Sequence, residues 1–326
     1  MNKIITTSIA LAVASTASLA NGDWLQLDQD IASLSSTVAA DGGATVGALL
    51  RNSYRDGGTT GGWAFEDVLV NATGSLEEFS WRISFNLEGG TAVLEDAYVT
   101  WDYDGDITST WGQFVLPMFR SATIGQESML FIDRSLLGAN YYSHDQGVSV
   151  AGSMNGLDWT IAAQNGADAA GEDLNLFAHV EYNLGNGANT CCDGAMHGGD
   201  ELDGTIGVSY MDMQDDSLDA VLGIDFAMTM GQFSLQAELA DAGDDTVGAG
   251  LGEAPFAITF GYLFADNMEA AYRHEDRDDA ADTSVESFGL NYYLHGHNAK
   301  WQINYIDDDA AADEVIAVGL TVGASS

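Results

Sequence analysis

The feature that most constrains the fold is a two-residue period that recurs from Ala44 to the end of the chain. In residues 79–87, FSWRISFNL, apolar and polar side chains alternate at every position, and residues 174–184, 288–294 and 300–305 follow the same pattern. Successive side chains of a β-strand point to opposite faces of the sheet, so each segment predicts a strand with one apolar face. The chain is therefore expected to be all-β.

The alternating segments number sixteen, an even count, and most are nine to twelve residues long. Strands of soluble proteins usually have about five or six residues, whereas a tilted strand that crosses a bilayer needs about 9–11. We therefore predict a transmembrane antiparallel β-barrel over residues 44–326. The predicted strands are 45–55, 64–73, 76–87, 92–103, 107–116, 144–153, 157–165, 174–184, 203–212, 218–229, 231–240, 254–264, 267–276, 284–295, 298–307 and 313–323.

The connections between these segments alternate in length, with one end short and the other long, as in outer-membrane barrels. A soluble β-sandwich is the alternative, but its strands are shorter and its apolar face points to a core. Tight turns are expected at Gly74-Ser75, Asn155-Gly156, Met230-Gly231, Asp266-Asn267 and His295–Asn298. Aromatic residues that suit the girdles at the two interfaces of a bilayer end many apolar tracks, namely Trp101, Trp111, Trp159, Tyr182, Tyr292, Trp301 and Tyr305.

Residues 1–20 have the pattern of a secretory signal peptide. One lysine precedes the apolar run Ile9–Ala14, and small residues lead to Ser18-Leu19-Ala20, so cleavage is expected after Ala20. A membrane anchor is the alternative, but this run is too short to span a bilayer. No later stretch approaches the roughly 18 apolar residues that a spanning helix needs. The mature chain is therefore expected to be exported.

Residues 21–43 predict a short amphipathic helix in the periplasm, before the barrel. Asp23 is a helix-capping residue, Gly42-Gly43 ends the segment, and the apolar residues between them follow the a/d repeat of a short coiled coil. Two heptads are marginal alone, so the helix needs a partner, either sister chains or the body of the protein. Its apolar residues are Trp24, Leu27, Ile31, Leu34 and Val38.

The chain carries 50 acidic and 9 basic residues, a net charge of −41, which excludes nucleic acid as a partner because phosphates could not be neutralised. If the apolar side chains face lipid, their polar neighbours face the lumen. A cation on the lipid face would cost about 2–4 kcal/mol near the midplane. On this parity the residues expected to line the lumen are Arg51, Arg82, Asp96, Asp158, Glu181, Asp225, Glu238, Glu269, Arg273 and Lys300.

Residues 112–135, GQFVLPMFRSATIGQESMLFIDRS, interrupt the two-residue period. Pro117 ends a strand, because it lacks an amide donor, and the residues that follow have no clean period. This irregular segment nevertheless contains Arg120 and Arg134, two of the nine basic residues in the chain. Scarce positive charge in a long loop indicates a functional position.

Four stretches resemble the phosphate-selective porin family, porins O and P. They are GQFVLPMF followed by FIDRS, LEDAYVTW at 94–101, FEDVLVNATGSLEEFSWRISFNLE at 65–88 and NAKWQINY at 298–305, in the order of the family. The resemblance implies a sixteen-stranded, usually trimeric pore, integral to the outer membrane of a Gram-negative bacterium. It also implies that the third long loop, here 117–142, folds inward. The expected constriction charges are then Arg120, Glu127, Asp133 and Arg134.

The sequence departs from that family in two respects. Phosphate-selective members line the pore with many Arg and Lys, which this chain lacks, and such barrels commonly end in an aromatic residue, whereas this chain ends GLTVGASS. Because rings of carboxylates favour cations, we expect a porin for passive diffusion of ions and small polar solutes, with a modest cation preference. The alternative is a non-conducting structural barrel or a surface β-protein. Outer-membrane lipids and sister chains of a homotrimer are the other expected partners.

Acidic loops are candidate sites for weak calcium binding, since hard cations take oxygen ligands. None has the spacing of an EF-hand, so solvated surface loops are the plainer interpretation and no cofactor is expected. No catalytic motif such as Gly-x-Ser-x-Gly or His-Glu-x-x-His occurs, so no enzyme is predicted. The acidic loops are 102–106, 212–219, 241–245, 275–282 and 307–314.

Loop 185–203 contains Cys191 and Cys192, together with Asp193, His197 and Asp200. Thiolate and imidazole are ligands for soft metals, but adjacent cysteines do not match the usual two-to-four-residue spacing of zinc sites. A disulfide between neighbours in an exposed loop is therefore the favoured interpretation, and no metal site is predicted.

Overall fold

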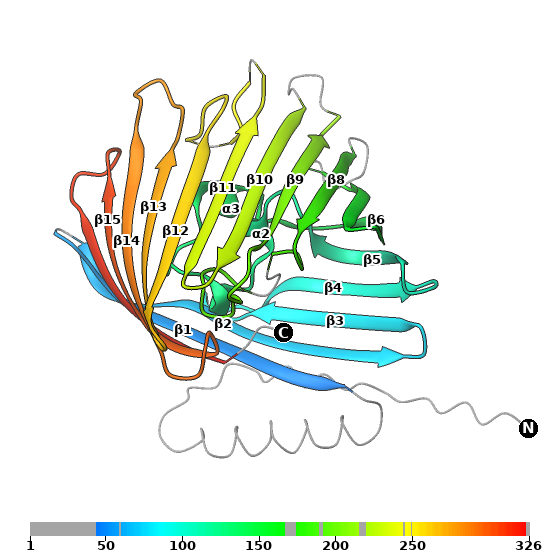
Figure 1. Ribbon diagram of the computed structural model, residues 1–326, viewed down its shortest axis with the longest axis horizontal. Coiled ribbons are helices and arrows are strands. Elements are labelled where there is room, and N and C mark those ends of the chain that lie inside the picture. Colours follow the sequence, from blue (N-terminus) through cyan, green and yellow to red (C-terminus); the bar gives the residue numbers. More distant parts are fainter. Residues whose placement is uncertain are drawn as a thin grey trace, which may run out of the picture.

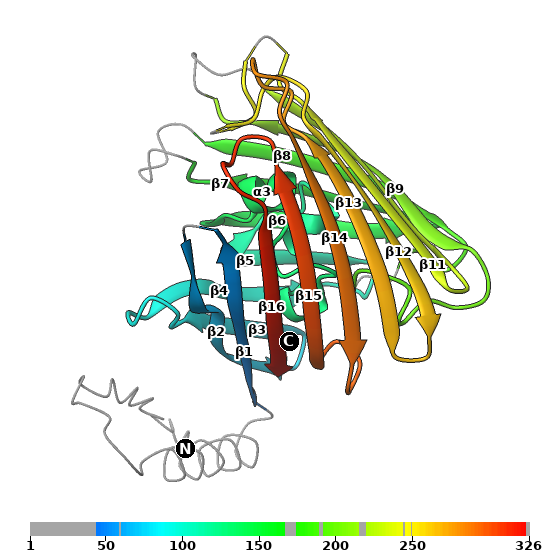
Figure 2. The same ribbon diagram turned by 90° about the vertical axis from the view of Figure 1, so that its left-hand side faces the viewer.

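The computed structural model describes residues 44–58, 60–166, 174–188, 192–214, 220–243, 245–248 and 250–323 (Figure 1, Figure 2). The predicted signal peptide, 1–20, and the predicted helix, 21–43, lie outside these residues. The strands are β1 (Thr45–Gly57), β2 (Thr60–Leu76), β3 (Phe79–Asn86), β4 (Val93–Asp102), β5 (Ile107–Val115), β6 (His144–Met154), β7 (Leu157–Gln164), β8 (Asn175–Leu184), β9 (Asp203–Asp212), β10 (Val221–Met230), β11 (Phe233–Asp241), β12 (Phe256–Ala265), β13 (Met268–Asp276), β14 (Ser284–Tyr293), β15 (Ala299–Asp308) and β16 (Val315–Gly323).

These sixteen strands form one closed antiparallel barrel. Each strand pairs with its neighbours in the chain, and β1 closes the barrel on β16, with Leu49 opposite Gly323 and Asp56 opposite Ile316. The alternation of apolar and polar residues sets this register, because a slip of one residue would turn the apolar face of a strand into the lumen. The predicted all-β barrel of sixteen strands is confirmed.

Short turns gather at one end of the barrel, which we call the turn end, and longer connections at the other, the loop end. Asn155-Gly156 and Asp266-Asn267 are at the turn end, as predicted. The connection between β8 and β9, residues 185–202, is long although it belongs to the turn end. We call it the turn-end segment, and it folds toward the lumen rather than away from the barrel.

One predicted turn is wrong. Gly74-Ser75 lies inside β2, and the chain reverses at Glu77-Glu78 instead. Gly74 stands opposite Trp81 of β3, and a Cβ atom on Gly74 would lie 2.6 Å from the indole ring. This glycine therefore leaves room for a cross-strand aromatic ring rather than forming a turn.

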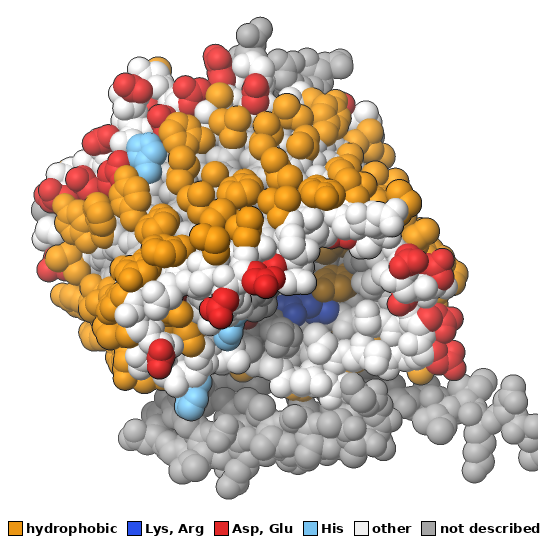
Figure 3. Space-filling model, viewed as in Figure 1, with side chains coloured by type: hydrophobic (Ala, Val, Ile, Leu, Met, Phe, Trp, Pro, Cys, Tyr) orange, Lys and Arg blue, Asp and Glu red, His pale blue; other side chains and the backbone are white. Residues whose placement is uncertain are grey.

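The outer face of the barrel is apolar. Figure 3 shows a broad band of apolar side chains, with acidic side chains along its upper rim and others below the band and at its right-hand edge. Aromatic rings stack across strands near the turn end, with Phe79 and Trp101 5.6 Å apart and Phe233 and Tyr262 4.9 Å apart between centroids. Exposed rings in this number would be unfavourable in water, whereas a bilayer with two interfaces accommodates them.

The interior is filled on one side by the connection between β5 and β6, residues 116–143, which we call the inner loop. It contains α2 (Arg120–Thr123), η1 (Gln126–Ser128) and α3 (Leu136–Tyr141). No helix in the described ranges is long and apolar enough to cross a bilayer. The main apolar core joins the inner loop to the barrel wall through Met118, Phe119, Leu137, Phe177 and Met211.

Candidate functional site

The inner loop is held against the barrel wall mainly through its own carbonyl groups. Asn291 of β14 donates to the Leu130 carbonyl over 3.0 Å, and Lys300 of β15 donates to the Met129 carbonyl over 2.5 Å. The Asn304 side chain accepts from the Ile132 amide over 2.8 Å. An irregular backbone at membrane depth needs such partners, because lipid offers none.

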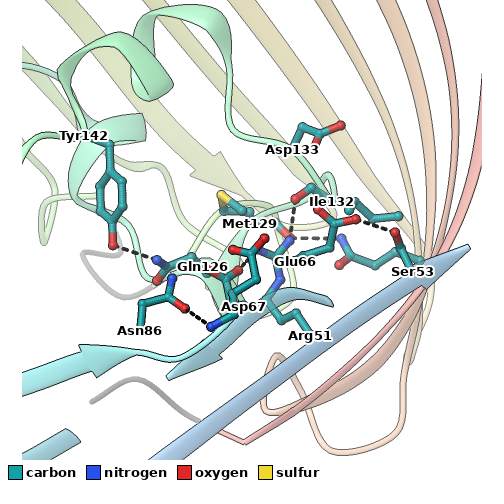
Figure 4. A network of polar contacts seen from close by, with 12 residues as sticks. Arg51, Ser53, Glu66, Asp67, Asn86, Gln126, Met129, Ile132, Asp133 and Tyr142 are labelled. Atoms are coloured by element: carbon teal, nitrogen blue, oxygen red, sulfur yellow. Dashed lines mark hydrogen bonds and ion pairs between the residues drawn. The ribbon is translucent and has the colours of Figure 1, made fainter. Parts of the chain in front are cut away.

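Three arginines of the wall fasten the same stretch. Arg51 of β1 pairs with Asp67 of β2 over 2.5 Å and also donates to the Ile132 carbonyl, which Figure 4 shows from nearby. Arg273 of β13 donates to the Asp133 carbonyl over 3.0 Å, with its guanidinium 4.6 Å from the centre of the Phe131 ring. These cations hold the loop in place rather than facing open water.

The third anchor is Arg55 of β1, whose two terminal nitrogens donate to the two carboxylate oxygens of Asp133 over 2.8 and 2.6 Å. Burial would raise the pKa of Asp133, but the hydrogen bonds and charge of Arg55 outweigh it and hold the pKa below its ordinary value. A two-pronged arginine–carboxylate pair is geometrically specific, so it fixes the position of the loop at this point.

Carboxylates of the wall accept from the backbone of the inner loop. Glu238 of β11 accepts from the Ser121 amide over 2.8 Å and from its hydroxyl over 2.5 Å, and Glu275 of β13 accepts from the Leu136 amide over 2.5 Å. Both carboxylates are almost fully buried, so each needs these donors to offset its loss of water. The buried acids thus position α2 and α3.

The turn-end segment enters the lumen from the opposite end and meets the inner loop. The Asp193 amide donates to the Ser128 carbonyl over 3.0 Å, and Arg120 donates to the Cys192 carbonyl over 2.9 Å. The Ala195 amide also donates to Glu269 of β13 over 2.7 Å. Cys192 itself is buried, so the predicted exposure is wrong at this residue, although residues 199–202 of the same connection are exposed.

A cavity of about 1140 Å³ lies between these two inserted segments and the wall formed by β3 to β7. The space is one-sided, because the inner loop is hydrogen-bonded to the opposite wall, at β9, β11, β13, β14, β15 and β1. Its polar and aromatic lining from the wall is Arg82, Asp96, Tyr98, Thr100, Thr110, Phe114, His144, Ser149 and Thr160. From the inserted segments and the β14–β15 turn it includes Gln126, Glu127, Arg134, Tyr142, His197, His295 and His297.

Charges of both signs face this cavity. Arg82 and Asp96 form an ion pair of 2.6 Å on the wall, and His144 lies 3.5 Å from the same carboxylate. Across the space, Glu127 and Arg134 belong to the inner loop, and the guanidinium of Arg134 stands 4.1 Å from the centre of the Tyr142 ring. Burial lowers the pKa of Arg134, which still remains a cation at neutral pH.

The predicted site residues separate into three groups. Glu127, Arg134, Arg82 and Asp96 line the cavity, whereas Arg120 and Asp133 contact other protein groups. The predicted lining residues that the inserted segments cover instead are Arg51, Glu238, Glu269, Arg273 and Lys300. Asp225 is buried on β10, Glu181 is half-buried on β8, and Asp158 bonds with Ser153 and Asn183 near the β6–β7 turn. Their roles in permeation stay predictions.

Sequence reasoning missed Arg55, Glu66 and His144. Arg55 is four residues after Arg51 in the same strand, so both side chains lie on the same face of that strand. The alternation that placed Arg51 in the lumen could therefore have placed Arg55 there too. Glu66 accepts from Arg55 over 3.0 Å, but no local pattern predicts that pair, because the two residues lie on adjacent strands.

The acidic loops hydrogen-bond to their own backbones. Asp102 accepts from the Gly105 amide over 2.6 Å, and Asp279 accepts from the Thr283 amide over 2.8 Å. These bonds hold the two carboxylates against turns of their own loops. In the described part of the chain, the group of three residues with metal-ligand geometry is not acidic but contains Cys192, His197 and His297.

Comparison with known proteins supports the fold. No protein-family model matches the sequence, and no curated protein matches it. Among solved structures, OmpF of Salmonella typhi in complex with daunomycin is 12% identical, with a TM-score of 0.61 over 86% of this chain and 97% of that chain.

Two further solved structures have a similar fold. A mutant of the Rh. blastica porin has 12% identity and a TM-score of 0.58, over 86% of this chain and 99% of the other. A loop-deletion mutant of OmpT, an outer membrane protein of Vibrio cholerae, has 11% identity and a TM-score of 0.59, over 86% and 98%. The chain therefore has the fold of porins.

Proposed function

We propose that this protein is an outer-membrane porin through which ions and small polar solutes diffuse passively. The observation that carries the proposal is the lined cavity inside a closed barrel whose outer face is apolar. A lumen with polar and charged walls holds water, and the inner loop narrows it from one side. The proposal includes export to the outer membrane and no enzymatic activity.

The lining argues for a general pore rather than a phosphate-selective one. Arg82 and Arg134 are matched by Asp96 and Glu127 around the cavity. Selective anion pores need an excess of Arg or Lys at the constriction, and the net charge of the chain is −41. We therefore propose a modest preference for cations.

The proposal also includes a homotrimer. Its support is the face from β2 to β6, which carries the apolar side chains of greatest exposure, namely Trp63 at 74%, Leu76 at 70%, Met154 at 63% and Trp111 at 60%. A sister barrel against this face would cover them. Light scattering of the detergent-solubilised protein, corrected for bound detergent, measures the mass and is expected to give three chains.

The decisive experiment is a recording in planar lipid bilayers. Purified protein is expected to give discrete conductance steps, and in a KCl gradient the reversal potential is expected to show cation preference. Heat-modifiable migration on a denaturing gel serves as the control for a folded barrel. A folded barrel without conductance would favour the alternative of a structural barrel, and clear anion selectivity would contradict the proposed preference.

A further inference from the structure

Three side chains with metal-binding chemistry meet at the edge of the cavity, although they come from separate parts of the chain. Cys192 and His197 belong to the turn-end segment, and His297 belongs to the turn between β14 and β15. The cysteine sulfur and one nitrogen of each ring all lie within 4.8 Å of one another. The two imidazole rings have centroids 5.4 Å apart. All three residues line the cavity.

The ring nitrogen Nε2 of His297 is available to bind a ligand. Its side chain is 2% exposed, and Nε2 has no hydrogen-bond partner among the described residues. The other nitrogen, Nδ1, lies 3.3 Å from the ammonium nitrogen of Lys300. A buried ring nitrogen without a partner in the protein is a position that a ligand can satisfy.

Gly296, next to His297 in the chain, leaves room for the ring of His197. Gly296 has a φ of +56°, which favours glycine, and a Cβ atom there would lie 3.3 Å from Nε2 of His197. A larger residue would be strained and would crowd that ring. His197 is exposed, whereas Cys192 and His297 are buried, so the cluster lies at the edge of the cavity.

Cys192 is disulfide-bonded, and Cys191 is the only other cysteine in the chain. A dithiol reductant can break this S–S bond by two exchange steps. It is itself oxidised to a disulfide and leaves two cysteine thiols. Cys192 then loses its proton when it binds a metal, because the thiolate is the ligand.

We propose that, in the reduced protein, Cys192, His197 and His297 bind a zinc-type divalent ion at the turn end of the cavity. One thiolate and two imidazoles suit borderline and soft metals, and a site with three protein ligands leaves a fourth position open.

The site has a consequence for the cavity. Because it joins the turn-end segment to the β14–β15 turn, the ion would lock two parts of the lining together and add positive charge beside the passage. Bound Zn²⁺ is therefore expected to lower conductance. This effect rests on the proposed function, whereas the binding itself does not.

Direct binding tests the site without any transport. In Cys191→Ser, Cys192 is a free thiol without any reductant, so we would titrate this folded variant with Co²⁺ and follow its spectrum. The expected result is saturable one-to-one binding with a thiolate-to-cobalt charge-transfer band that Zn²⁺ removes. Adding His197→Ala is expected to weaken Co²⁺ binding more than about tenfold. His295→Ala, in the β14–β15 turn with His297 but outside the cluster, is the matched control.

Measurements on the oxidised wild-type protein and on His297 variants show whether the disulfide blocks the site and whether His297 is a ligand. The disulfide-bonded wild-type chain is expected to lack the charge-transfer band and to gain it after treatment with a dithiol that is then removed. Because His297 is buried, both His297→Ala and His297→Gln would be tested, with heat-modifiable migration as the check for folding. Absence of the band in Cys191→Ser, or a band that neither His197→Ala nor a folded His297 variant weakens, would overturn the proposal. Zn²⁺ binding without a change in conductance would overturn only the effect on the channel.

Discussion

At the residue scale, the acids and bases of the interior have two separate tasks. Arg51, Arg55 and Arg273 fasten the inner loop, whereas Arg82 and Arg134 face the cavity. The alternation in the sequence places a side chain inside the barrel but does not distinguish these tasks. The distinction depends on which part of the wall the inner loop covers, and that is a long-range property of the fold.

The Arg55–Asp133 pair predicts a pH-dependent stability. The pKa of Asp133 in the folded protein is held below its ordinary value of about 3.8, so its stabilisation is complete above that pH. It is lost as the pH falls through the lower, folded-state pKa. The Asp133 side chain is 40% exposed, so we expect Asp133→Asn to cost about 1 kcal/mol or less at neutral pH.

Urea unfolding in detergent, measured from pH 3 to 7, checks this prediction. The difference in unfolding free energy between wild type and Asp133→Asn is expected to be constant above about pH 4 and to shrink below it. Asp266→Asn, an exposed acid in a turn, is the control and is expected to have little effect. A difference that grows on acidification would show that the carboxylate is not held by Arg55.

The charges that face the cavity predict a second outcome. Arg134→Ala is expected to increase the cation-to-anion permeability ratio, and Glu127→Gln to decrease it. A unit charge about 10 Å from an ion in water contributes about 0.4 kcal/mol, with opposite signs for cations and anions, so a change of about fourfold in the ratio is expected. Arg120→Ala removes the same charge from α2, outside the cavity lining, and is the matched control. Equal shifts for Arg134→Ala and Arg120→Ala in reversal-potential measurements would contradict the assigned lining.

At the scale of elements, the strands could be predicted because a two-residue period is a local signal. Most predicted bounds agree with the structure to within a few residues, and the clearest failure, at Gly74, has a physical cause. A glycine in a strand and a glycine in a turn are alike in sequence, and only the ring of Trp81 on the next strand separates them. The route of the inner loop was expected only by resemblance, because its partners are distant in the sequence.

The Gly74–Trp81 contact predicts an effect on stability. Gly74→Ala places a methyl group 2.6 Å from the indole ring, so the ring must move, and a cost of about 1–3 kcal/mol is expected. Gly89→Ala, where no atom lies within 4 Å of the added carbon, is the matched control. In a Trp81→Ala background, the penalty of Gly74→Ala is expected to disappear. Urea unfolding of wild type, Gly74→Ala, Trp81→Ala and the double variant measures the four free energies of unfolding. A penalty of Gly74→Ala that persists without the indole ring would show that the contact with Trp81 is not its cause.

At the scale of the whole molecule, the net charge of −41 surrounds a cavity with balanced charges. Acidic side chains lie along the upper rim of the apolar band in Figure 3, and others lie below the band and at its right-hand edge. They would therefore act on permeating ions through the electrostatic field at the mouth of the barrel rather than through direct contact in the cavity. Composition alone predicted the sign of this field, whereas the balance of charge along the cavity required the fold.

A field of this kind predicts a dependence on salt. The Debye length falls from about 10 Å at 0.1 M to about 3 Å at 1 M ionic strength. The cation preference is therefore expected to weaken as the KCl concentration rises from 0.1 to 1 M at a fixed concentration ratio across the bilayer. Reversal potentials measure it directly, and a preference that is independent of salt would instead locate selectivity at Glu127 and its close neighbours.

The anchoring of the inner loop also bears on how the barrel is built. The Ile132 amide bonds with Asn304, 172 residues later, and the Leu130 carbonyl bonds with Asn291, 161 residues later. In the order of the chain, residues 130–132 precede β14 and β15. Their hydrogen bonds can therefore form only after most of the barrel wall has formed. Contacts of such long sequence separation make folding slow. We expect the final closure of β1 on β16 to be the step that commits the loop to the interior, so that folding intermediates expose it to proteases and the finished barrel does not.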